Sequence, residues 1–249
     1  MIPEWFTYLS WFGLTLGIVS SLIIVVDLLG SHGQHMKVMN LVWPVAALFG
    51  SVVTLVGYFR YGRLATEERF ETAELAGREP PSKTETPFRV MVAKAASHCG
   101  SGCTIGDIMA EFLVLAFPVV ATWFGWKSLF PESEVGKVYS TWVVDFLFAF
   151  VLGIVFQYFT IVPMRKLSPG KGLKAALKAD TLSLTAWQLG MYGFMGFINL
   201  YVARTIWHHS MKPDSPEFWF SMQLAMICGF MTSYPVNWWL LRKGIKEKM

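Results

Sequence analysis

The chain has 249 residues, of which 54% are hydrophobic and only 15% are charged, whereas an average soluble domain carries about 25% charged residues. The mean hydropathy is +0.45, and the formal net charge is +4. These values exclude a disordered chain, a basic nucleic-acid-binding domain and an ordinary soluble enzyme. They predict an integral membrane protein whose partner is the lipid bilayer and not a nucleic acid.

Six apolar runs follow one another along the chain, and each is long enough to cross a bilayer. They lie at residues 5–28, 40–59, 104–124, 140–163, 182–203 and 218–240. A helix needs about 20 apolar residues to span the hydrocarbon core, and the runs lack the alternating pattern of strands. The predicted fold class is therefore all-α: one polytopic membrane domain over residues 1–249 with six transmembrane helices. The last run follows Ser215, Pro216 and Glu217, which are typical of a helix start.

The positions of lysine and arginine predict the orientation of these helices. The segments 60–103, 164–181 and 242–249 together hold 16 of the 21 basic residues, and the other three connections hold the remaining five. Basic residues concentrate in cytoplasmic loops. We therefore expect both termini to be cytoplasmic.

The only long connection, residues 62–103, is predicted to be a cytoplasmic loop. Its first part is rich in glutamate and arginine. Its second part has apolar residues at positions 88, 91, 92 and 95, which is a helical spacing. We expect a short amphipathic helix there, lying on the inner membrane surface.

The string HCGSGCTIGDIMAEF, residues 98–112, concentrates chemical groups at the start of the third run. His98, Cys99 and Cys103 are ligand types that suit zinc or copper(I), and the glycines between the cysteines would allow a tight turn. Asp107 and Glu111 are four residues apart and share one helix face. The predicted metal site comprises His98, Cys99, Cys103, Asp107 and Glu111. Two alternatives stay open: a purely structural turn with Asp107 at a helix start, or a redox-active cysteine pair.

Other polar and sulfur residues could extend such a site. Glu111, Asp145 and Asp27 lie within apolar runs, where acids often mark ion or proton paths. Met222, Met226 and Cys228 in the last run, with Met191 and Met195 in the fifth, supply soft sulfur ligands, although methionine is also ordinary apolar filling. His32 and His35 in the first connection, with His208 and His209 in the last, could form a second metal site if the two connections touched.

The His98-Cys-x3-Cys-x3-Asp string and the ending MTSYPVNWWLLRKGIKEKM resemble an uncharacterised bacterial membrane family, the domain of unknown function numbered 4396. The resemblance covers roughly residues 95–249. It implies a multi-pass protein of the bacterial inner membrane and supplies no mechanism.

We therefore expect a protein that transports or handles a transition-metal ion, with copper ahead of zinc, through the cytoplasmic His-Cys-x3-Cys cluster. No catalytic motif was found, so an enzyme is the less favoured class. The alternatives are a membrane redox protein and a non-catalytic subunit of a membrane complex. The oligomeric state, the direction of transport and the energy source are not indicated by the sequence.

Overall fold

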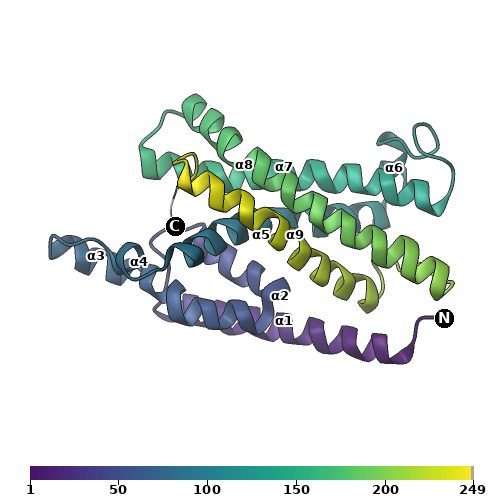
Figure 1. The fold of residues 1–249 in the computed structure, drawn as a ribbon, viewed down its shortest axis with the longest axis horizontal. Helices are drawn as coiled ribbons and strands as arrows, with labels where there is room; N and C mark the ends of the chain where they lie inside the picture. The colour runs from purple at the N-terminus through teal and green to yellow at the C-terminus, as the bar shows by residue number, and fades with distance from the viewer. Residues whose placement is uncertain (248–249) are drawn as a thin grey trace.

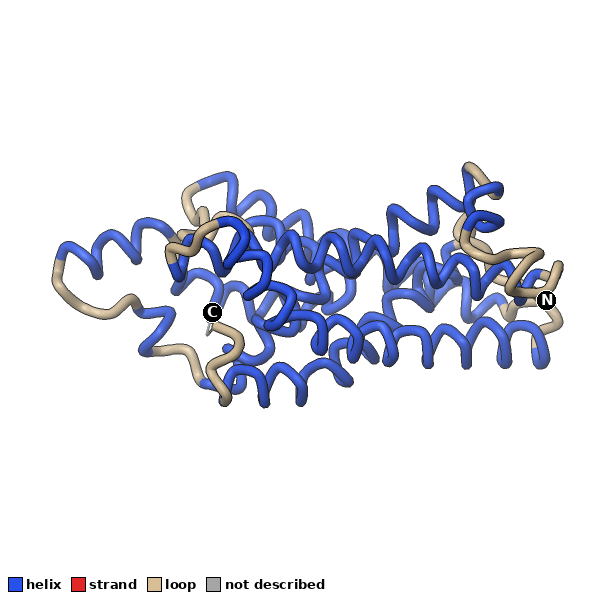
Figure 2. The backbone as a smooth tube through the Cα atoms, turned by 90° about the horizontal axis from the view of Figure 1, so that it is seen from above, coloured by secondary structure: helices blue, strands red, loops and turns tan. Residues whose placement is uncertain are grey.

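The computed structural model describes residues 1–247 and is all-helical over that range, as the sequence predicts. The elements in chain order are α1 (Glu4–Gly30), α2 (Met39–Gly57), η1 (Tyr58–Gly62), η2 (Arg63–Ala65), α3 (Glu67–Leu75), α4 (Pro81–Thr84), α5 (Phe88–Ala116), α6 (Val119–Trp123), α7 (Glu134–Arg165), α8 (Pro169–Met195), η3 (Gly196–Ile206) and α9 (Pro216–Arg242). The long helices run side by side, and the connections collect at the two ends of the bundle (Figures 1 and 2).

Four helical segments have the length and apolar composition needed to cross a membrane: Glu4–Gly30, Met39–Ala65, Phe88–Ala116 and Glu134–Arg165. Their outward-facing side chains are largely apolar, as lipid contact requires; Val26, for example, is 71% exposed. The protein therefore has the helices of an integral membrane protein.

The second of these segments does not run straight through the bundle. At Ser51 the backbone leaves the helical region (φ 45°, ψ −128°), and the chain turns back on itself. The amide of His35 donates to the carbonyl of Ala65 at 3.0 Å, so the two ends of the segment meet. Residues 39–65 therefore form a helical hairpin with its tip inside the bundle, so the predicted span at residues 40–59 is not confirmed as one straight crossing.

The tip of this hairpin is held by a side chain from the last helix. Nε2 of Gln223 in α9 donates to the carbonyl oxygen of Leu48 at 2.6 Å. Gly17 in α1 lies so close that a Cβ there would be 2.6 Å from the same carbonyl oxygen. Gln223 thus supplies a hydrogen bond to a backbone carbonyl that the turn leaves without a helical partner, and an unpaired carbonyl would be costly in an apolar surrounding.

The hairpin places the two termini at opposite ends of the bundle (Figure 1). The amino terminus donates to the carbonyl of Trp207 at 2.8 Å, whereas Lys246 contacts α5 at the other end. The prediction that both termini are cytoplasmic is therefore not confirmed. We call the two ends of the bundle the N-terminal end and the C-terminal end.

The third apolar run also begins earlier than expected. α5 is one continuous helix from Phe88 to Ala116, so residues 98–103 are not a loop and Asp107 is not at a helix start. The segment expected to lie on the membrane surface is the first part of α5, where Val92 and Ala95 are fully buried and pack with Leu241 of α9. The other runs agree well with helices, and α9 begins as predicted, with Ser215 accepting from the amide of Phe218.

Candidate functional site

A close contact between α5 and α7 positions the polar interior of the bundle. A Cβ at Gly102 would lie 2.8 Å from Cα of Gly153, and one at Gly106 would lie 2.5 Å from the amide nitrogen of Ala149. Small residues let two helix backbones approach this closely. The glycines of the Cys99–Asp107 region therefore serve helix packing and not a metal-binding turn.

This contact brings together three carboxyl groups, which we call the acid cluster: Asp107 and Glu111 of α5 and Asp145 of α7. Asp107 and Asp145 are fully buried, and Glu111 is 6% exposed. One oxygen of Asp107 accepts from Nε2 of Gln188 at 3.2 Å, while both oxygens of Asp145 have no hydrogen-bond partner within residues 1–247. The three groups are close enough for their charges to interact.

The acid cluster forms no ion pair in the described part of the chain, although Lys137 lines the same cavity as Glu111 and its charge acts on that carboxyl group. No lysine, arginine or histidine nitrogen lies within 4 Å of its carboxyl oxygens. Burying ionised carboxylates without a partner is costly. A proton or a cation that entered the cluster would offset this cost.

A second buried group of polar residues, the lysine cluster, lies at the C-terminal end and consists of Lys246, Asp180, Cys99, Asn237 and Ser183. The ammonium of Lys246 donates to Oδ1 of Asp180 at 2.6 Å and to Oδ1 of Asn237 at 2.9 Å, and it lies 2.7 Å from the sulfur of Cys99. Asn237 donates to Ser183 at 2.6 Å, and Ser183 lies 3.1 Å from the same sulfur. Burial alone would lower the pKa of Lys246, but Asp180 and Cys99 outweigh burial and raise it above its usual value.

His98, the first residue of the predicted metal site, points away from the cysteines. Its Nε2 lies 2.8 Å from the hydroxyl of Thr160 on α7, and its Nδ1 has no hydrogen-bond partner within residues 1–247. No group of three or more His, Cys, Asp and Glu residues in that range is arranged to hold a metal ion. The five predicted ligands therefore do not meet at one point.

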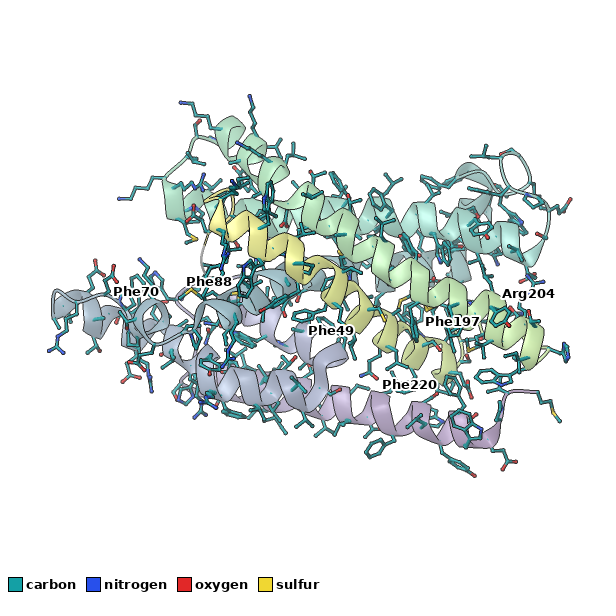
Figure 3. The ribbon with its side chains drawn as sticks, in the orientation of Figure 1. Phe49, Phe70, Phe88, Phe197, Arg204 and Phe220 are labelled. Atoms are coloured by element: carbon teal, nitrogen blue, oxygen red, sulfur yellow. The ribbon has the colours of Figure 1, made fainter. Side chains whose placement is uncertain are left out.

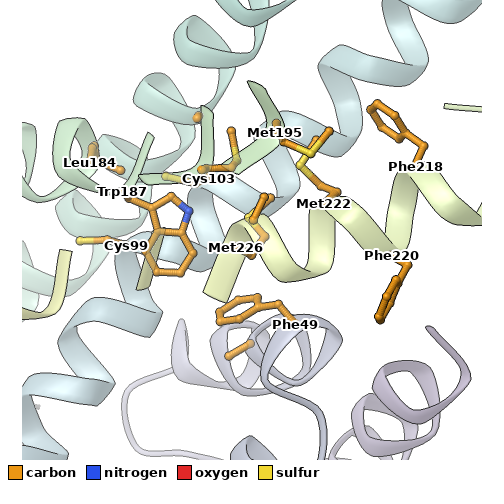
Figure 4. Close-up of a cluster of buried hydrophobic side chains, with 14 of the residues drawn as sticks. Phe49, Cys99, Cys103, Leu184, Trp187, Met195, Phe218, Phe220, Met222 and Met226 are labelled. Carbon is orange, nitrogen blue, oxygen red and sulfur yellow. The ribbon is translucent and has the colours of Figure 1, made fainter. Parts of the chain in front are cut away.

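Sulfur atoms nevertheless follow one another through the core, in a set that we call the sulfur row. Its members are Cys99, Cys103, Met191, Met195, Met211, Met222 and Met226, all at most 4% exposed and all in one packed cluster. Figure 4 shows five of them along the core between α5, α8 and α9. Cys103 and Asp107 lie one helical turn apart on α5, so the sulfur row passes beside the acid cluster.

A cavity of about 250 Å³, the vestibule, opens at the N-terminal end of the bundle. Its lining includes Glu111 of the acid cluster, Met195 and Met211 of the sulfur row, and Asn199. The side-chain oxygen of Asn199 is buried without a hydrogen-bond partner in residues 1–247. Asn199 belongs to η3, a π-helical stretch, and such stretches are frequent at functional sites.

Asp27 and His35 form local hydrogen bonds and ion pairs, and the histidines do not form a second metal site. Asp27 accepts from the hydroxyl of Tyr58 at 2.6 Å and pairs with Arg63, so it fastens α1 to the hairpin. His35 lies 3.1 Å from Glu67 at the C-terminal end, whereas His208 and His209 follow η3 at the opposite end (Figure 1). The four histidines therefore cannot meet.

Sequence reasoning missed Asp180 and Lys246 as site residues. They are 66 positions apart, and neither stands in a recognisable motif. The only signal in the sequence is that Asp180 stands beside an apolar run. Asp145 was noticed, but its proximity to Asp107 and Glu111 depends on the α5–α7 contact.

Comparison with known proteins places the chain in a family. The family described as "Domain of unknown function (DUF4396)" matches residues 90–246, which include α5, the acid cluster and the lysine cluster. The chain belongs to this family, as its motifs suggested. No curated protein and no solved structure matches it.

Proposed function

We propose that this DUF4396 protein carries a transition-metal cation across a bacterial inner membrane, with copper(I) ahead of zinc, along the sulfur row and the acid cluster. The observation that carries the proposal is the acid cluster, whose three buried carboxyl groups form no ion pair within residues 1–247 and adjoin a row of buried sulfurs. Thiolate and thioether sulfurs select copper(I), and the carboxylates supply the charge that a desolvated cation needs.

The proposed path starts in the vestibule, where Met195, Met211 and Glu111 face the cavity. It continues past Asp107 and Cys103 to Cys99 at the C-terminal end. There the Lys246 ammonium occupies the space next to Cys99 and Asp180, which a cation would need for release. The C-terminal segment must therefore move before the cargo leaves the protein.

The distribution of basic residues supports an orientation for this path. Only four of the 20 lysines and arginines within residues 1–247 belong to the N-terminal end: Lys127, Lys137, Arg204 and Lys212. Figure 3 places Arg204 there. We propose five membrane crossings and one re-entrant hairpin, with the C-terminal end in the cytoplasm. The vestibule would then face outside.

Elemental analysis and uptake assays test the proposal. Purified wild-type protein, supplied with copper or zinc and kept free of chelator, should retain about one metal ion per chain. Vesicles containing the protein and an internal copper(I) chelator should accumulate copper. Cys103→Ser should reduce both signals at least tenfold, whereas Cys228→Ser, a change to a cysteine outside the sulfur row, should leave them unchanged.

Three results would overturn the proposal or change the cargo. Wild-type protein that neither binds nor takes up metal would remove it, and Cys103→Ser with unchanged binding would remove the sulfur row as the path. Uptake of zinc without copper would change the cargo. The redox alternative is less well supported, because Cys99 and Cys103 are both fully buried and a redox partner needs access to a thiol. The subunit alternative predicts co-purifying proteins and no effect of Cys103→Ser.

A further inference from the structure

An apolar cavity of about 490 Å³ lies near the C-terminal end, between the hairpin, α5 and α9. Its volume is in the range of ordinary ligand pockets. Trp43, Phe49 and Phe230 line its interior. Val53, which is 82% exposed, and Met231, which is 59% exposed, also line it, so the cavity opens on the apolar outer surface of the bundle. An occupant would therefore enter from the bilayer.

Lys94 of α5 lines the same cavity and is only 5% exposed. Its ammonium donates a single hydrogen bond, to the carbonyl oxygen of Tyr61 at 3.2 Å, and no carboxylate lies within 4 Å of it in residues 1–247. An ammonium has three hydrogens to donate. A buried cation without a counter-charge is costly, so this position favours an anionic group.

The depth of Lys94 indicates which anion fits. It is the seventh residue of α5, so it lies about 9 Å along the helix from its start, near the basic end of the bundle. A free inorganic anion would gain nothing from the apolar walls. An amphiphile satisfies both features, because its anionic head can pair with the ammonium while its hydrocarbon chain fills the cavity.

We propose that this cavity is a binding site for an anionic phospholipid of the cytoplasmic leaflet, with the phosphate on Lys94 and an acyl chain between the hairpin and α9. The site is separate from the vestibule and the sulfur row. Its occupancy would hold the hairpin against α5 and α9. The inference does not depend on metal transport.

Lipid binding to the delipidated protein in detergent, measured by native mass spectrometry, tests this site. Phosphatidylglycerol should bind at least tenfold more tightly than phosphatidylcholine. Lys94→Gln should abolish that preference, and Lys94→Arg should retain it. Lys83→Gln, a change to an exposed lysine at the same end, should leave it unchanged. Val53→Trp, which narrows the mouth of the cavity, should weaken phosphatidylglycerol binding while leaving Lys94 in place.

Equal binding of the two lipids to the wild type, or a preference that survives Lys94→Gln, would overturn the proposal. Binding of oleate without phosphatidylglycerol would also overturn it, in favour of a free fatty acid. If Lys94→Gln does not fold, the Val53→Trp variant tests the proposal instead. Unchanged phosphatidylglycerol binding to Val53→Trp would show that the lipid does not occupy this cavity. Metal retention measured on the same samples shows separately whether the proposed transport function stands.

Discussion

Lys246 and Asp180 form an ion pair whose two side chains are both completely buried, with 2.6 Å between Nζ and Oδ1. Asp180 lies in α8 and Lys246 follows α9, so the pair attaches the C-terminal segment to the interior of the bundle. The second oxygen of Asp180 has no hydrogen-bond partner within residues 1–247. Lys246 is therefore the main group that compensates the buried negative charge of Asp180.

Removing Lys246 should destabilise the protein strongly. Lys246→Met leaves Asp180 buried without a counter-charge, and breaking a buried pair in this way costs about 3–5 kcal/mol. The double variant Lys246→Met/Asp180→Leu should recover most of that loss. Lys243→Met, which changes an exposed lysine, is the control. Thermal unfolding in detergent measures the stability of the wild type and the three variants. If Lys246→Met is as stable as the wild type, the ion pair contributes nothing to stability.

The two glycines Gly106 and Gly193 give a matched comparison. A Cβ at Gly106 would lie 2.5 Å from the backbone nitrogen of Ala149, whereas a Cβ at Gly193 would meet nothing within 4 Å. Gly106→Ala should lower the free energy of unfolding by about 1–3 kcal/mol through overpacking and should separate the members of the acid cluster. Gly193→Ala should be neutral or stabilising by up to about 1 kcal/mol.

Denaturation and metal retention of the two alanine variants check this prediction. If copper binding depends on the acid cluster, Gly106→Ala should weaken it and Gly193→Ala should not. Two alanine variants with the same stability would contradict the close α5–α7 contact.

The sequence predicted much of the fold because membrane helices leave strong local signals. The run 218–240 and the Ser215–Pro216 start gave α9 nearly correctly, and the runs 5–28 and 140–163 agree with α1 and α7. The turn at Ser51 was missed because an apolar pattern shows where a chain is buried but not whether it reverses. Only the pair Gly50–Ser51 stands at the turn, and such residues also occur inside straight membrane helices.

The site was predicted less well, for a related reason. Glycine permits both tight turns and close helix contacts, so the sequence predicts a metal-binding turn at Gly100 and Gly102, whereas the structure uses these residues to pack helices together. Asp107 and Glu111 were correctly placed on one helix face. Asp145, Asp180 and Lys246 come from other helices, and their positions depend on contacts that a single sequence does not indicate.

Acid should loosen the connection between α1 and the hairpin at Glu67. Lys37 and His35 contact the Glu67 carboxylate, and their hydrogen bonds hold its pKa below its usual value. A carboxyl group whose pKa is lowered by folding stabilises the folded state above its unfolded pKa, about 4.3, and that contribution disappears as the pH falls through the folded value. The protection of the amides of residues 31–38 against hydrogen exchange, relative to the intrinsic rate at each pH, should therefore fall below about pH 4.

The control for this pH effect is Glu67→Gln, which removes the titrating group. In that variant the exchange of residues 31–38 should already be faster at neutral pH, and its dependence on acid should be smaller. An identical acid response in the two proteins would place the sensitive group elsewhere. Because Glu67 is exposed to solvent, raised salt should also weaken the contact in the wild type.

The membrane orientation gives the most direct test of the hairpin. If residues 39–65 enter and leave at the C-terminal end, positions 33 and 79 must lie on the same side of the membrane, and the N-terminus must lie on the opposite side. Six straight crossings would instead put positions 33 and 79 on opposite sides. Topology reporters that are active on only one side of the membrane, inserted at the N-terminus and at these two positions, distinguish the arrangements.

We expect a cytoplasmic signal at 33 and 79 and an external signal at the N-terminus, because 16 of the 20 basic residues within 1–247 belong to the C-terminal end. Opposite signals at 33 and 79 would show that Ser51 does not reverse the chain in the membrane.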